Sequence, residues 1–105
     1  MIKIIDGLRY NTETATKIGE WGNGLYTSDF RWQCESLYVT KKGRYFLVGE
    51  GGPATHYSYS PDGNSRCGGE ELHVLTFNDA RIWCEDHDQD AIESHEPFKS
   101  LIREA

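Results

Sequence analysis

The most informative stretch of the sequence for the fold is LYVTKKGRYFLVGEGGP, residues 37–53. It contains most of two runs rich in β-branched and aromatic residues, at 36–40 and 44–48, which are typical of strands. Lys41-Lys42-Gly43 joins the runs, and a glycine can supply the positive φ angle that a tight turn needs. The pattern therefore predicts an antiparallel hairpin with four core side chains, those of Leu37, Val39, Phe46 and Val48.

Shorter patterns before this hairpin predict further strands. Asp6-Gly7 separates two β-rich runs, 3–5 and 8–10, as the turn of an N-terminal hairpin does. Residues 11–21 fit either a strand or a helix, and their threonines favour a strand. Glycine, asparagine and serine then make residues 22–31 a loop.

After the central hairpin the pattern changes from strand to helix. The alternation at 56–60 and the apolar residues at 70–75 predict two more strands. Thr76 can cap a helix, with Asp79 three residues later in the position of a capping box. Apolar side chains follow at helical spacing, namely Ala80, Trp83 and Cys84.

A second helix is expected at 91–95, resuming after Pro97 with an apolar stripe of Phe98, Leu101 and Ile102. Strands first and helices last predict an α+β fold. We expect one domain, 1–105, in which an antiparallel sheet of three to five strands carries one or two C-terminal helices on one face.

No motif for catalysis or cofactor binding fits its context. Residues 49–54 match G-x-G-x-x-A. A dinucleotide site needs this turn to open a helix, but Pro53 and the alternation at 56–60 predict that no helix follows. The glycines are instead expected to let the chain bend or bulge as it leaves the hairpin. Because no nucleophile motif is present either, we expect no enzymatic activity and no cofactor.

The three cysteines indicate reduced thiols. Their number is odd and their spacing wide, which argues against a disulfide framework. Cys84-x-x-His87 is only half of a structural zinc motif, so we expect a buried Cys84, a helix end at His87 and no metal. No apolar run reaches the roughly 20 residues of a membrane span. A cytoplasmic protein without membrane contact is expected.

The charge is concentrated at one end of the sequence. The net charge is −6, and residues 61–105 hold four Lys and Arg against eleven Asp and Glu. Residues 85–96 hold six carboxylates and no Lys or Arg, which fits either a solvated loop or a surface that mimics a nucleic-acid backbone. The candidate partner-binding residues are Glu85, Asp86, Asp88, Asp90, Glu93 and Glu96.

The tip of the central hairpin offers an alternative site. Lys41, Lys42 and Arg44 could contact phosphates while Tyr45 stacks on a base, as in a small nucleic-acid contact. Basic hairpin tips also keep sheet edges soluble, and the overall acidity opposes general nucleic-acid binding.

Three segments and one tyrosine carry a resemblance: RYNTETAT at 9–16, the opening stretch at 37–53, Tyr57 and LTFNDARIWCE at 75–85. Together they resemble small accessory proteins carried by bacterial phages, plasmids and integrated elements. The resemblance implies a protein that blocks host machinery, as anti-CRISPR proteins do, in the cytoplasm of the bacterial host.

With the charge pattern, this resemblance leads to one hypothesis and two alternatives. We expect an inhibitor that binds a basic groove on a host protein or ribonucleoprotein complex, a nucleic-acid-guided effector, without binding nucleic acid directly. The alternatives are an accessory factor that contacts nucleic acid through the basic hairpin tip, and a small enzyme of unknown reaction.

Overall fold

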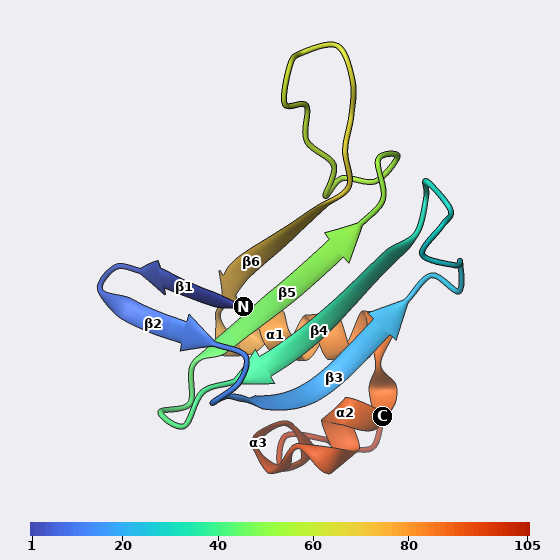
Figure 1. Cartoon of the computed structure of the whole chain (residues 1–105). Helices are drawn as coiled ribbons and strands as arrows, with labels where there is room; N and C mark the ends of the chain where they lie inside the picture. Colours follow the sequence, from blue (N-terminus) through green and yellow to red (C-terminus); the bar gives the residue numbers. More distant parts are fainter.

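The structure is a computed structural model and describes residues 1–105. Six strands are followed by three short helices (Figure 1). The strands are β1 Ile2–Ile5, β2 Leu8–Asn11, β3 Thr16–Gly22, β4 Gln33–Val39, β5 Tyr45–Gly51 and β6 Gly69–Leu75. The helices are α1 Phe77–His87, α2 Gln89–Ser94 and α3 Glu96–Lys99. The predicted α+β fold is confirmed.

Four strands form an antiparallel sheet in the order β3-β4-β5-β6. The helices cover one face of this sheet, and the separate hairpin β1–β2 lies on the other face (Figure 1). The predicted central hairpin is β4–β5, in which Leu37 pairs with Leu47. Of residues 11–21, for which a strand was favoured over a helix, 16–21 lie in β3, whereas Thr12 and Thr14 lie in the turn before it.

The sheet separates two clusters of buried side chains. On the helix face, Leu37 and Leu47 pack against Trp83 and Cys84 of α1. On the hairpin face, Phe46 and Leu72 pack against Tyr10 of β2. Alternation along β4 and β5 supplies both clusters, because successive side chains of a strand point to opposite faces.

The turns and the cap of α1 are as predicted. Asp6 and Gly7 have φ angles of 51° and 76°, and Gly43 has 85°, which are the left-handed values that tight hairpin turns require. The Thr76 hydroxyl accepts a hydrogen bond from the backbone N–H of Asp79 at 3.1 Å. Cys84 is fully buried, and burial raises the pKa of its thiol to about 11.

Three local predictions are wrong. Residues 56–60 do not form a strand, because β6 occupies the edge of β5 and Tyr57 turns inward to be buried. The helix is interrupted at His95 as expected, but it resumes at Glu96 rather than after Pro97, because Pro97 lies in the first turn of α3, where its missing N–H costs nothing. That helix ends at Lys99, so Leu101 and Ile102 lie beyond it and are about half exposed.

The glycines after the central hairpin do not form a bulge. β5 runs through Gly51 with regular pairing to both neighbours. Gly49 instead leaves room for the ring of Tyr57, which lies where a Cβ would be. The absence of a side chain here allows a close approach rather than a bend.

Candidate functional site

The acidic segment 85–96 lines a groove. Three of its carboxylates, those of Glu85, Asp90 and Glu93, surround a hollow of about 520 Å³ between the helices and the residues after α3. Ile92, Leu101 and Ile102 give the hollow apolar walls, and Gln89 and Arg103 complete it. We call these eight residues the acidic groove.

A second hollow, of about 320 Å³, continues the acidic groove along α1. The two share Glu85, Ile92, Leu101 and Ile102, so they form one depression. The second hollow adds Phe77 and Phe98 and is lined mainly by apolar side chains. Exposed apolar surface therefore lies directly beside the acidic rim.

The carboxylates of Asp90 and Glu93 lie one turn apart on α2. Both side chains are exposed and accept no hydrogen bond from the rest of the protein. The carboxylate of Glu85 differs, because it pairs with the Arg81 guanidinium at 3.0 Å along α1. Asp90 and Glu93 are thus the two groove carboxylates that form no ion pair, with Arg103 as the one cation of the same lining.

The side chain of Asp88 binds the sheet and does not line the acidic groove. Its carboxylate accepts a hydrogen bond of 3.0 Å from the backbone N–H of Glu20 in β3. Gly19 lets α1 and α2 approach β3 closely beside this bond, since a Cβ there would lie 3.0 Å from Trp83 and 3.2 Å from Ala91. The carboxylate of Asp88 therefore holds the junction of α1 and α2 against the edge strand.

The other two predicted acidic residues, Asp86 and Glu96, are exposed but do not line the acidic groove. Of the six candidates, the structure brings three together around one hollow, uses one to hold the helices, and leaves two elsewhere on the surface.

The basic hairpin tip is only partly as expected. Lys41, Lys42 and Arg44 are exposed around Gly43. Tyr45, however, is 6% exposed, stacks on Phe98 at a centroid distance of 5.4 Å and shares a hydrogen bond of 2.8 Å with His95. Its ring belongs to the core of the helix face, so Tyr45 cannot stack on a base.

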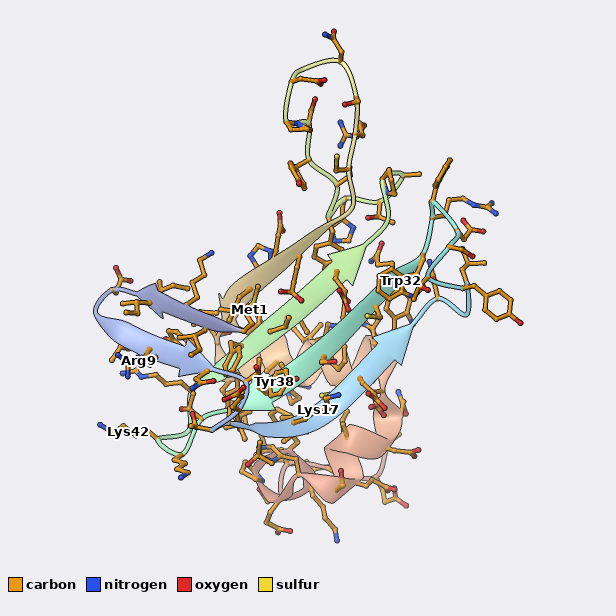
Figure 2. The ribbon with its side chains drawn as sticks, viewed as in Figure 1. Met1, Arg9, Lys17, Trp32, Tyr38 and Lys42 are labelled. Carbon is orange, nitrogen blue, oxygen red and sulfur yellow. The ribbon has the colours of Figure 1, made fainter.

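The fold adds a residue to the tip that the sequence did not suggest. Arg9 of β2 lies with Lys41, Lys42 and Arg44 around a cleft of about 250 Å³. Figure 2 shows the side chains of Arg9 and Lys42 on the same side of the molecule. The remaining lining residues are uncharged, namely Leu8, Tyr10, Asn11, Thr14 and Thr40. We call this the basic cleft.

A buried carboxylate on the helix face was also not predicted. Glu35 of β4 is 8% exposed and accepts hydrogen bonds from the Tyr57 hydroxyl and, at 3.0 Å, from Nε1 of Trp83. Burial and the bond to Glu35 raise the pKa of the Tyr57 hydroxyl, which stays protonated and donates. Neither hollow of the acidic groove includes this network, which joins β4, the loop 52–68 and α1.

Metal and membrane sites have no counterpart in the structure. No group of three His, Cys, Asp or Glu side chains is arranged to hold a metal ion. None of the helices combines the length and apolarity needed to cross a membrane.

Comparison with known proteins adds no relative. No family model, curated protein or solved structure matches this chain.

Proposed function

We propose that the protein is an inhibitor that binds a basic surface of a host complex through its acidic groove and catalyses no reaction. The observation that carries this proposal is the position of Asp90 and Glu93, unpaired carboxylates beside the exposed apolar side chains of Leu101 and Ile102. We infer from the resemblance that the host complex is a nucleic-acid-guided effector, bound in the bacterial cytoplasm in the manner of an anti-CRISPR protein.

The charge supports a basic partner. A protein with a net charge of −6 attracts a positive surface and is steered toward it, and the attraction weakens as salt screens the charges. A groove of Lys and Arg built to hold phosphates could accept carboxylates in their place. The acidic surface would then compete with the nucleic acid for that groove.

The apolar walls support a protein or ribonucleoprotein partner over free nucleic acid. Binding energy at protein interfaces comes mainly from a few buried apolar and aromatic anchors, with charged residues setting orientation and association rate. Ile92 and Ile102 would receive such an anchor, while Asp90 and Glu93 pair with basic residues around it. The partner surface should combine an apolar side chain with flanking Lys or Arg.

An interference assay in cells tests the proposal. Cells that carry a nucleic-acid-guided defence complex are challenged with a targeted plasmid, with and without expression of the protein. We expect the protein to raise plasmid survival and the double charge reversal D90K/E93K to abolish the rise. D88K is avoided, because Asp88 holds the helices against β3.

The matched control is E13K/E70K, which changes the net charge by the same amount. Both carboxylates are exposed and neither forms an ion pair. The control should inhibit as the unmodified protein does. Equal inhibition by D90K/E93K and E13K/E70K would show that the acidic groove is not the binding surface.

A further inference from the structure

The 11 Lys and Arg side chains of this protein fall into three groups: three paired with a carboxylate, four gathered in the basic cleft, and four that lie elsewhere and form no ion pair, namely Lys3, Arg66, Lys99 and Arg103. Lys17, Arg31 and Arg81 each form an ion pair with a carboxylate of the chain. The four cations of the basic cleft form none, and their side chains donate no hydrogen bond to the protein. In a chain with 17 Asp and Glu and 11 Lys and Arg, four unpaired cations share one cleft without a carboxylate in its lining.

The fold creates this cluster from distant segments. Arg9 comes from β2, whereas Lys41, Lys42 and Arg44 come from the turn between β4 and β5. The hairpin β1–β2 brings them together by packing Tyr10 edge-to-face on Phe46, with ring centroids 5.5 Å apart. The contact is buried on both sides, so the cluster is held by the core of the hairpin face.

Like charges repel, so gathering four cations costs stability unless an anion balances them. The cleft also offers the hydroxyl of Thr40, which accepts from the Arg44 N–H and can donate its own hydrogen bond to an anionic oxygen. Its volume of about 250 Å³ lies below the roughly 300–1,000 Å³ of drug-sized ligand pockets, so it suits an anionic group better than a whole cofactor.

We propose that the basic cleft binds a phosphate group through Arg9, Lys41, Lys42 and Arg44. Arginine pairs with phosphate oxygens in a two-pronged geometry, and lysine adds point charges around it. The phosphate can belong to a nucleic-acid backbone or to a small phosphorylated molecule. Because Tyr45 is buried and Tyr10 packs in the core, no exposed aromatic of the cleft stacks on a base, and recognition is independent of base sequence.

This inference goes beyond the proposed function and does not depend on it. It also departs from the expectation of no direct nucleic-acid contact, because the phosphate can belong to a nucleic acid. Arg9 is a further residue, which the sequence-based site did not include. The acidic groove and the basic cleft share no residue, so one can fail without the other.

Fluorescence anisotropy with labelled single- and double-stranded oligonucleotides of about 15 units tests the inference at increasing salt. Inorganic pyrophosphate serves as the small ligand, with binding followed by chemical-shift changes of the backbone amides of 8–14 and 40–44. The variants are R9Q and K41Q/K42Q. K99Q is the matched control, because Lys99 is an exposed cation outside the cleft.

We expect binding that weakens with salt, and each cleft substitution should lower the slope of log affinity against log salt by about one per charge removed. K99Q should leave affinity and slope unchanged. Stronger binding of oligonucleotide than of pyrophosphate identifies the backbone as the source of the phosphate, and the reverse identifies a small ligand. No binding of either ligand at low salt, or equal binding by R9Q, K41Q/K42Q and K99Q, overturns the inference.

Discussion

The Tyr57 hydroxyl donates a hydrogen bond to the carboxylate of Glu35, 22 residues earlier in the chain. The same carboxylate accepts Nε1–H of Trp83 at 3.0 Å, so one buried side chain holds a strand, a loop and a helix together. No buried side-chain nitrogen or oxygen of the protein lacks a hydrogen-bond partner. Stability on the helix face should therefore depend strongly on Glu35.

Glu35→Ala should lower the free energy of unfolding by about 2–6 kcal/mol, because it leaves two buried donors unpaired at about 1–3 kcal/mol each. Tyr57→Phe keeps the Trp83 bond and should cost less. Urea denaturation measures both. Glu13→Ala, at an exposed carboxylate, is the control and should change stability by less than about 0.5 kcal/mol. A cost for Glu35→Ala as small as that of the control would contradict this role.

Gly49→Ala should destabilise the protein by about 1–3 kcal/mol, the usual cost of overpacking. The added Cβ would overlap the Tyr57 ring and push its hydroxyl away from Glu35. The effect should shrink when Tyr57 is already replaced by alanine, since the ring that causes the overlap is gone. A double-mutant cycle in denaturant measures the coupling energy between the substitutions at Gly49 and Tyr57. Additive effects on the free energy of unfolding would show that the Tyr57 ring does not depend on the absence of a side chain at position 49.

Stability should fall as the pH drops below about 6.5, the ordinary pKa of histidine. Burial lowers the pKa of His95 in the folded state, so the unfolded chain binds a proton at a higher pH than the folded chain does. The stabilisation by neutral His95 is fully present above the pKa that His95 has in the unfolded chain. It is lost as the pH falls from there through the lower pKa that His95 has in the folded chain. Thermal unfolding between about pH 7.5 and 5 measures the trend. His95→Gln should make the melting temperature depend less on pH in this range. If the variant and the unmodified protein show the same pH dependence, His95 is not its cause.

Asp88→Ala should destabilise the protein by about 1 kcal/mol through loss of the hydrogen bond to the Glu20 N–H. Asp86→Ala should have little effect, because the side chain of Asp86 is exposed and makes no such bond. Denaturant titration of the two variants separates a carboxylate that holds the fold from one that is free to act. Equal stability of the two variants would assign Asp88 to the surface instead.

Local patterns predicted most of the fold. The hairpins around Gly7 and Gly43 and the cap at Thr76 depend on residues close in sequence, which the chain displays directly. The alternation at 56–60 misled, because Tyr57 is buried by a contact with Gly49 that no local pattern encodes. Pro97 misled for a different reason, since a proline can end a helix or begin one.

The sites were less predictable than the fold. The acidic run was visible, but only the structure separates Asp88, which is bound to β3, from Asp90 and Glu93 in the groove. Arg9 joins the basic cleft through packing of the β1–β2 hairpin on Phe46, a contact between distant segments. Glu35 carries no local signal either, because a single charged residue in a strand usually faces solvent.

We propose that the acidic groove binds a basic surface in competition with nucleic acid. Its most direct test is an equilibrium competition on a purified guided effector complex, in which the protein is titrated against labelled target nucleic acid. We expect the unmodified protein and E13K/E70K to displace the target alike, and D90K/E93K to need at least about tenfold higher concentration. Equal displacement by D90K/E93K would show that the acidic groove does not bind the basic surface.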